Sequence, residues 1–304
     1  MKKVLVTGAN GFLGTELVKE LVSRNINVIA VDKAFKNEVF KYPIVECINI
    51  EDVPFEILEM KMKDSGIDCF IHLAWRGTSG LLRSDYGVQL ANVKLTCDYV
   101  TLCSRINCPR FVYASSINEM ETYEYLQMDS ILPSGGYIYG TGKLAAHFMG
   151  ETVAKLNDIE FIPVIITNIY GAGEKSVRLI NSSIRKLLKG EHCSFTAGEQ
   201  TYDFIYLTDA IRSIVEVAEK GNAYTRYYIG SGNPRPLRDF LIEMRDIVSP
   251  EAELGLGDLP FNGVNIDYSQ FKLKKVEEDT GYRNRVSFKD GIRLLCESIK
   301  DEEI

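Results

Sequence analysis

The sequence lacks the features that mark several classes of protein. Its seven cysteines are scattered and form no C-x-x-C pair, so they predict reduced thiols rather than a disulfide framework. The three histidines, at positions 72, 147 and 192, do not have the spacing of metal ligands, and we predict no metal site. The formal net charge is −7 and no block of basic residues occurs, which argues against a nucleic-acid partner.

Long apolar runs are also missing. None approaches the ~18 residues that a membrane span needs, and the N-terminus enters a strand pattern rather than a signal peptide. We therefore expect no membrane partner and a cytoplasmic location. Apolar residues make up 45% of the chain and charged residues 25%, which is typical of globular proteins, and 304 residues can bury a sizeable core.

The strongest pattern lies in the first 22 residues. Residues 4–6 form the short apolar run of a strand buried on both faces, and apolar residues recur at helical spacing from position 13 to position 21. Between them stand Gly8, Gly11 and Gly14. Gly8 permits a tight turn, Gly11 removes a Cβ from the path of a pyrophosphate, and Gly14 lets the helix pack closely. Strand, turn and helix N-terminus predict a dinucleotide-binding cradle, although glycines this close also occur in ordinary turns.

A carboxylate follows at the offset that such a cradle requires. Residues 27–32 read as a second buried strand that ends in Asp32, 18 residues after Gly14. An acid at about 20 residues accepts hydrogen bonds from the adenosine ribose and repels a 2′-phosphate. We therefore predict NAD as the cofactor and regard NADP as less favoured, although Lys33 softens that preference. The alternative is a solvated Asp at a strand end.

Strands and helices alternate through the first half of the chain. We predict further strands at 43–48, 68–73, 110–115 and 161–166, with helices at 55–63, 86–106 and 137–156. This alternation is typical of a Rossmann-type, doubly wound parallel sheet in an α/β fold. We assign residues 1–168 to the dinucleotide-binding domain, with 200–230 returning to it. Residues 169–199 and 231–304 then form a smaller substrate-binding lobe.

Chemistry is expected where the strands end. Ser116 follows the strand at 110–115, and Tyr139 and Lys143 are four residues apart on a predicted helix, hence on one face. A phenol with pKa ~10 is a poor base at neutral pH, but a neighbouring ammonium favours the phenolate. Tyr139 could then take or return a hydroxyl proton, with Ser116 hydrogen-bonded to the same substrate oxygen. The alternative is a helix with a buried Tyr and a surface Lys.

Several motifs together resemble the extended short-chain dehydrogenase/reductase family that acts on nucleotide-linked sugars. They are TGANGFLG at 7–14, HLA at 72–74, Asn92, SS at 115–116, YGTGK at 139–143, NIYGAGE at 168–174, DFIYLTDA at 203–210 and GSG at 230–232. The resemblance implies NAD-dependent oxidation and reduction, usually at sugar C4. It also implies a homodimer paired through the helices at 86–106 and 139–156.

The resemblance carries further site residues over to this sequence. In the cofactor site it implies the three glycines, Asp32 and Lys143, together with Phe12, Leu13, Asn49, Ile50, Leu73, Ala74 and Asn92. In the substrate site we expect Trp75 and Asn118, with Asn168 at the end of the sixth strand. Residues 81–83 are expected to border the sugar because of their place after the fourth strand.

The sequence departs from the family pattern at three places. Relatives often carry an arginine at the position of Tyr202 and another at Ile165, so other cations must hold the nucleotide diphosphate; Arg178 and Arg235 are our candidates. In 4,6-dehydratases Asp-Glu follows the residue that matches Ser116, whereas here Glu119 comes one position late. We therefore rank a nucleotide-sugar 4-epimerase first, a 4-keto-6-deoxy-sugar reductase second and a 4,6-dehydratase third. A non-catalytic NAD-binding regulator is the alternative of a different class.

Overall fold

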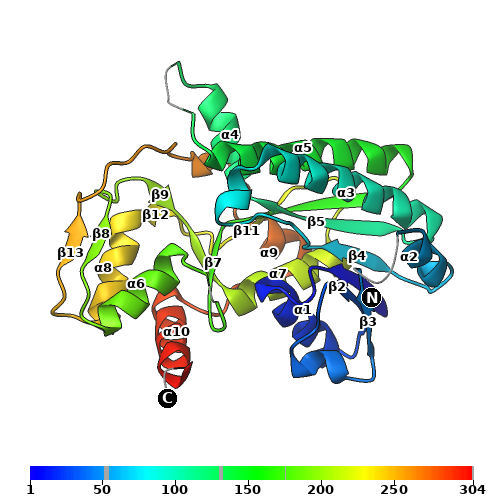
Figure 1. The fold of residues 1–304 in the computed structure, drawn as a ribbon, viewed down its shortest axis with the longest axis horizontal. Coiled ribbons are helices and arrows are strands. Elements are labelled where there is room, and N and C mark those ends of the chain that lie inside the picture. Colours follow the sequence, from blue (N-terminus) through cyan, green and yellow to red (C-terminus); the bar gives the residue numbers. More distant parts are fainter. Residues whose placement is uncertain (51–54, 130–132, 175, 303–304) are drawn as a thin grey trace.

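A seven-stranded parallel sheet forms the centre of the molecule (Figure 1). The computed structural model describes residues 1–50, 55–129, 133–174 and 176–302. The strand order is β3-β2-β1-β4-β5-β6-β11, which confirms the predicted doubly wound Rossmann-type sheet. The strands are β1 (Lys3–Thr7), β2 (Asn27–Asp32), β3 (Val45–Asn49), β4 (Cys69–His72), β5 (Arg110–Ser116), β6 (Glu160–Ile166) and β11 (Tyr227–Ile229).

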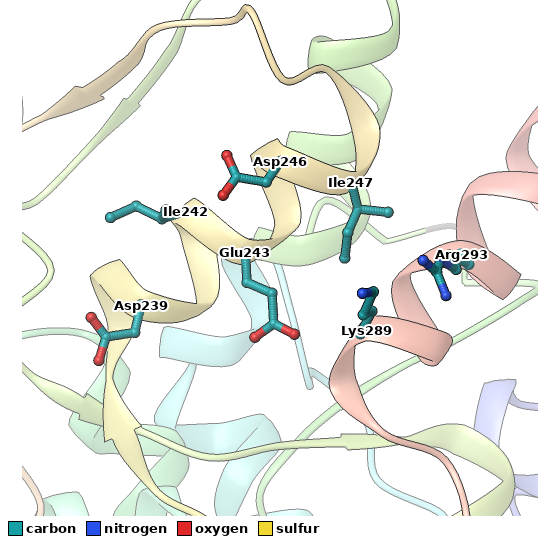
Figure 2. Close-up of a pocket in the computed structure, with 7 residues that line it drawn as sticks. All are labelled: Asp239, Ile242, Glu243, Asp246, Ile247, Lys289 and Arg293. Carbon is teal, nitrogen blue, oxygen red and sulfur yellow. The ribbon is translucent and has the colours of Figure 1, made fainter.

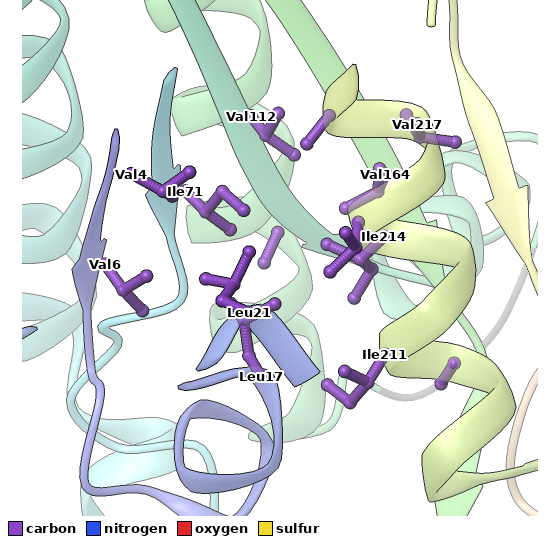
Figure 3. Packing of buried hydrophobic residues seen from close by; sticks show 14 of the residues in the cluster. Val4, Val6, Leu17, Leu21, Ile71, Val112, Val164, Ile211, Ile214 and Val217 are labelled. Carbon is purple, nitrogen blue, oxygen red and sulfur yellow. The ribbon is translucent and has the colours of Figure 1, made fainter. Parts of the chain in front are cut away.

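Helices cover both faces of the sheet. Alternate side chains of β1 point to opposite faces: Val4 and Val6 pack with α1 (Phe12–Ser23) and α7 (Leu207–Lys220), whereas Leu5 belongs to the core beneath α3 (Tyr86–Arg105) and α5 (Gly136–Leu156). Figure 3 shows the first of these cores, in which Leu17 and Leu21 from α1 and Ile211 and Ile214 from α7 lie between the helices and the sheet. The helices are α1 (Phe12–Ser23), α2 (Phe55–Met62), α3 (Tyr86–Arg105), α5 (Gly136–Leu156) and α7 (Leu207–Lys220).

The C-terminal part builds a separate lobe with its own apolar core (Figure 1). It contains three two-stranded sheets, β7–β10, β9–β12 and β8–β13. Its strands are β7 (Asn168–Tyr170), β8 (Cys193–Phe195), β9 (Thr201–Tyr202), β10 (Phe204–Tyr206), β12 (Arg235–Pro236) and β13 (Leu254–Leu256). Its principal helices are α6 (Leu179–Leu188), α8 (Leu237–Val248) and α10 (Phe288–Glu302), and α9 (Lys275–Thr280) packs beside α7.

The elements of the first half lie close to their predicted positions. β2 has the predicted bounds, while α3 and α5 differ from prediction by one residue at one end. α4 (Asn118–Leu126) was not predicted from the sequence, nor were the short 3₁₀ helices η1 (Glu38–Lys41), η2 (Leu81–Ser84) and η3 (Tyr268–Gln270). Residues 227–229 return to the central sheet as β11. The domain limits themselves stay a prediction.

The described residues hold neither a candidate membrane span nor a candidate metal site. No helix in those ranges is both long and apolar enough to cross a membrane. Within the same ranges, no group of three or more His, Cys, Asp or Glu side chains could hold a metal ion.

Candidate active site

The glycine turn after β1 packs tightly against its surroundings. Gly8 has φ +71°, a conformation that L side chains rarely adopt, and a Cβ there would lie 2.8 Å from the Ala74 nitrogen. A Cβ at Gly14 would lie 2.0 Å from the Gly8 carbonyl oxygen, so α1 starts directly on the loop. Gly11 caps α1 and lines an open cavity. The bare backbone at this helix N-terminus is suited to a phosphate.

The cavity beside the glycine turn has a volume of about 660 Å³. Asp32 lines it, and its carboxylate is held by the backbone N–H groups of Asn10 (2.8 Å) and Lys33 (2.7 Å). Asn49 lies opposite Asp32 in the β2–β3 register. The glycine turn, the Asp32 carboxylate and the volume of the cavity together fit a dinucleotide. The predicted cofactor residues that line this cavity are Gly8, Gly11, Phe12, Leu13, Gly14, Asp32, Ile50, Leu73, Ala74 and Asn92.

The loop after β4 separates this cavity from a second one. Asn92 fixes the loop because its amide exchanges two hydrogen bonds with the backbone of Arg76, at 3.1 and 2.8 Å. Trp75 lines both cavities, and its indole N–H donates to Gln89 at 2.7 Å. The second cavity measures about 700 Å³ and lies between the sheet and the C-terminal lobe. We call the two the cofactor cavity and the substrate cavity.

The end of β5 brings the three predicted catalytic residues together. Lys143 Nζ donates to the Ala114 carbonyl oxygen at 2.7 Å, and Ser116 is hydrogen-bonded to Tyr139. Tyr139 and Lys143 lie one turn apart on α5 and are 7% and 4% exposed. All three side chains line the substrate cavity. The sequence-based prediction of their proximity is therefore confirmed, whereas their chemical roles stay a prediction.

Burial moves the pKa values of this pair in opposite directions. Desolvation lowers the pKa of Lys143 to about 7. The charge of Glu119 acts in the opposite direction and raises the same pKa. Desolvation also raises the pKa of Tyr139, while its serine hydrogen bond and the charges of Arg83 and Arg178 oppose that change. The pair therefore loses one of its two protons near neutral pH. Local charges decide whether the remaining proton lies on the phenol or on the amine.

An arginine that the sequence placed only at the sugar border lies on Tyr139, the predicted catalytic tyrosine. Arg83 belongs to η2, and its guanidinium Cζ is 4.0 Å from the ring centroid of Tyr139. It is held there by the Thr78 carbonyl oxygen at 2.9 Å and by Asn118 Oδ1 at 3.1 Å. On the opposite side, Lys143 Nζ lies 3.8 Å from the ring centroid of Trp75. Trp75 in turn packs edge-to-face on Tyr139 with 6.2 Å between ring centroids, so Arg83 contacts the tyrosine directly and Lys143 contacts its aromatic neighbour.

The two asparagines predicted for the substrate site, Asn118 and Asn168, both line the substrate cavity. Asn118 Oδ1 accepts a hydrogen bond from Ser116 at 3.1 Å as well as the one from Arg83. Asn168 is tied to the lobe, since its side-chain amide donates to the Asp203 carbonyl oxygen at 3.1 Å. Asn118 thus links the serine to the arginine over Tyr139.

The two arginines proposed for the diphosphate have different surroundings. Arg178 is half exposed, lies 3.6 Å from Glu174 and lines both cavities, so it stands at their junction. Arg235 forms an ion pair with Glu243, and its Cζ is 3.9 Å from the ring centroid of Phe240. It is absent from the described lining of either cavity. The structure brings Arg178 to the site and leaves Arg235 in the lobe.

Other residues of the substrate cavity were not predicted from the sequence. Glu121 reaches it from α4, and Tyr202 from β9 is stacked on Phe204 with 5.7 Å between ring centroids. Phe261 comes from the irregular chain after β13. Short strands and turns carry no periodic pattern, so no local signal pointed to Glu121 or Phe261, whereas Tyr202 stands where relatives carry an arginine for the diphosphate. Glu121 could have been predicted as a site residue if α4 had been recognised in the sequence.

A separate groove lies between α8 and α10 (Figure 2). Glu243 points from α8 toward α10, where Lys289 and Arg293 line the opposite side. None of the residues that line it is among the predicted site residues. Glu243 is engaged by Arg235, so the groove is a charged boundary between two lobe helices.

Comparison with known proteins agrees with this geometry. Residues 4–230 match the model of the NAD dependent epimerase/dehydratase family. CDP-abequose synthase of Salmonella typhimurium is 25% identical over 97% of this chain and 98% of its own. The dTDP-4-dehydro-6-deoxyglucose reductase of Escherichia coli is 23% identical over 98% and 97%.

A solved structure shows the same fold. UDP-glucuronic acid 4-epimerase from Bacillus cereus, crystallised in complex with NAD, superposes with a TM-score of 0.78 over 99% of this chain and all of its own, at 21% identity. The family match covers most of the chain and includes the glycine turn, Asp32 and the Tyr139–Lys143 pair. The chain therefore belongs to the NAD dependent epimerase/dehydratase family, as an NAD-dependent enzyme of the extended short-chain dehydrogenase/reductase type.

Proposed function

We propose that this enzyme catalyses NAD-dependent oxidation and reduction at C4 of a nucleotide-linked sugar, as a 4-epimerase. The observation that carries the proposal is the buried Tyr139–Lys143 pair with Ser116 beside it, at the junction of two cavities. One cavity is suited to a dinucleotide and the other to a polar ligand of comparable size. Bound NAD supplies the hydride acceptor and donor.

Each residue of the pair has a distinct role in this proposal. Tyr139, as phenolate, takes the proton of the C4 hydroxyl group, and Ser116 orients the same oxygen through a hydrogen bond. Lys143 and Arg83 stabilise the phenolate by charge. The resulting 4-keto sugar must turn over in the cavity, so that hydride would return to the opposite face of C4 while Tyr139 returns the proton to the C4 oxygen. The lining asparagines and Trp75 are proposed to bind the sugar during that rotation.

The cofactor role follows from the first cavity. We assign the pyrophosphate to the turn at Gly8, Gly11 and Gly14 and the adenosine ribose to Asp32. Arg178 is our candidate for the substrate diphosphate, because it supplies a half-exposed cation at the junction of the cavities. It would replace the arginine that relatives carry at the position of Tyr202.

A reductase is the second candidate. It is favoured by the likeness to the Escherichia coli dTDP-4-dehydro-6-deoxyglucose reductase, which extends over nearly the whole of both chains. A reductase uses the same tyrosine to donate a proton to a keto oxygen, so the site geometry suits both activities. The epimerase ranks first because Asp32 favours NAD, which an epimerase regenerates within one turnover.

Dehydration is less well supported. Glu119 is 2% exposed, hydrogen-bonded to Ser115, and absent from the described lining of the substrate cavity. At the two positions that hold Asp-Glu in dehydratases this chain has Ile117 and Asn118. No acid–base pair of that kind therefore follows the serine.

We also propose a homodimer through α3 and α5. Tyr86, Leu90, Phe148 and Met149 on these helices are 54 to 73% exposed although they are apolar. Burying such a face against a second copy would remove it from water. A charge at this face, as in Leu90→Glu, is expected to give a monomer by light scattering, and an unchanged mass would rule out this interface.

The released cofactor tests the choice between the two candidate activities. The protein is purified without added nucleotide and denatured, and the supernatant is analysed for dinucleotides. Near-stoichiometric NAD is expected of an epimerase, which retains its cofactor between turnovers. An empty protein that binds NADH or NADPH reversibly would favour the reductase.

A further inference from the structure

The first turn of α4 packs on α5 next to the predicted catalytic tyrosine. Gly140 directly follows Tyr139 in α5. A Cβ at Gly140 would overlap the Asn118 carbonyl oxygen and Thr122 Oγ1, so only glycine allows the two helices to approach this closely. Thr122 Oγ1 in turn donates to the Asn118 carbonyl oxygen at 3.1 Å. The side chains at the start of α4 therefore have a fixed position relative to Tyr139.

A carboxyl group on this turn of α4 has no role in the proposed mechanism. Glu121 lines the substrate cavity and also a smaller cavity of about 140 Å³ that shares this wall. Its Oε2 accepts a hydrogen bond from Asn118 Nδ2. A carboxyl group can accept a hydrogen bond from an amide whether or not it is ionised, so this contact does not depend on the charge of Glu121.

The other end of the same amide holds two groups of the site. Asn118 Oδ1 accepts a hydrogen bond from the Ser116 hydroxyl at 3.1 Å and another from Arg83 Nη2 at 3.1 Å. Both of these residues contact Tyr139, Ser116 through a hydrogen bond and Arg83 through its guanidinium over the ring. The amide of Asn118 thus turns its oxygen to two donors and its nitrogen to an acceptor.

The reversed orientation of this amide does not fit its surroundings. Half a turn of the Asn118 amide would place its NH₂ group against the N–H donors of Arg83, and a guanidinium has no acceptor. The same turn would place the amide oxygen against the Glu121 carboxyl group. Glu121 and Arg83 therefore select one orientation from opposite ends, and removal of Glu121 would leave the amide nitrogen without its acceptor.

We propose that Glu121 is a positioning residue, which fixes the amide of Asn118 with its oxygen toward Ser116 and Arg83 and so keeps Arg83 over Tyr139. It acts through Asn118 and not on the substrate. Without this acceptor the amide is free to rotate, and of the two hydrogen bonds described for Arg83 only the one to the Thr78 carbonyl oxygen is kept. The effect on catalysis rests on the proposed function, whereas the arrangement of these side chains does not.

Two substitutions separate the orientation of the amide from the charge of the acid. Glu121→Gln removes the charge but keeps an oxygen that can accept from Asn118, whereas Glu121→Met keeps a side chain of similar length without that oxygen. The NMR signals of the Arg83 side chain, assigned from Arg83→Lys in NAD-loaded protein, are shifted upfield by the aromatic ring beneath them. The size of that shift is taken as the difference from Tyr139→Leu.

We expect the upfield shift of Arg83 to be retained in Glu121→Gln and to fall by at least half in Glu121→Met. Glu124→Met, on the same helix but paired with Gln270, is the matched control and should leave the shift unchanged. A shift that is retained in Glu121→Met, or that is lost equally in both variants, would overturn the proposal.

A measurement on the unsubstituted protein covers the case in which Glu121→Met does not fold. The side-chain ¹H–¹⁵N signals of Asn118 are assigned from Asn118→Asp. One of the two amide protons should lie downfield of the range of solvent-exposed asparagines and exchange slowly, because it is bonded to Glu121. Two protons with the positions and exchange rates of an exposed amide would overturn the proposal.

Turnover provides a test of coupling. If Glu121 acts through Arg83, Glu121→Met lowers kcat by no more than Arg83→Gln does, and the double variant is no slower than Arg83→Gln alone. Losses that multiply in the double variant would overturn the proposal. A protein that shows the expected Arg83 shifts but no C4 reaction would instead refute the proposed function alone.

Discussion

The guanidinium of Arg83 lies over the ring of Tyr139, with 4.0 Å from its Cζ to the ring centroid. Asn118 and the Thr78 carbonyl oxygen hold it in that position. A cation over an aromatic face is attracted to the ring, and the attraction increases when the phenol becomes a phenolate. Arg83 from η2 therefore brings a positive charge directly onto the ring of Tyr139, and Lys143 lies one helical turn away on α5.

Removal of the Arg83 charge tests this relationship. For Arg83→Gln we expect kcat to fall about tenfold, because a desolvated cation over a ring contributes on the order of 1–2 kcal/mol. Arg83→Lys should retain part of the rate. Steady-state kinetics measures both, with the exposed Arg105→Gln as the control. A wild-type kcat in Arg83→Gln would show that the contact serves packing alone.

The pH dependence of the reaction follows from the coupled pair. In the proposed mechanism the competent form carries one proton, on Lys143, with Tyr139 as phenolate. Because burial lowers the pKa of Lys143 to about 7, the doubly protonated pair loses its first proton near that pH. We therefore predict that kcat/KM for oxidation of the sugar increases as pH rises through about 7 and then levels off. A decrease through the same range would contradict this description.

The substrate diphosphate provides the next prediction. Arg178→Gln should raise the substrate KM about tenfold or more, because a hydrogen bond to a charged group is worth about 1.5–3 kcal/mol. Arg235→Met, which keeps an apolar side chain against Phe240, should leave KM close to wild type. Initial rates over a range of substrate concentrations measure both values. A larger effect on KM at Arg235 would reverse the assignment.

Asp32 is predicted to set the cofactor preference. Asp32→Asn keeps the size of the side chain but removes the charge that opposes a 2′-phosphate. We expect the ratio of the Kd for NADP to the Kd for NAD to fall about tenfold or more, measured by fluorescence or calorimetry. Asp98→Asn, at an exposed pair on α3, is the control. An unchanged ratio would remove Asp32 from the ribose site.

The parts of the fold that the sequence predicts share a physical basis. Buried parallel strands read as apolar runs, and long amphipathic helices repeat their pattern over many turns, so β2, α3 and α5 were placed to within a residue at each end. The Tyr139–Lys143 pair was found because helical spacing alone puts both side chains on one face. The proximity of this pair to Ser116 was predicted because Ser116 stands at the end of the predicted strand at 110–115.

The remainder of the site depends on contacts that local patterns do not encode. Arg83 is on a short 3₁₀ turn, and only tertiary packing places it on Tyr139. Glu119 is on α4, which has no strong apolar period, and it contacts His147, 28 residues away in the chain. Arg235 had the right chemistry for a phosphate, but an ion pair with Glu243 holds it within the lobe.

The fate of the C4 hydrogen tests the central claim most directly. C4-deuterated UDP-, CDP- and dTDP-hexoses are incubated with the enzyme as purified, with no added cofactor, and the products are analysed by NMR and mass spectrometry. We predict that at least one of them yields its 4-epimer with deuterium retained at C4, and that Tyr139→Phe abolishes this conversion. Turnover that requires stoichiometric NADH or NADPH, or that proceeds equally fast without the phenol, would contradict the account.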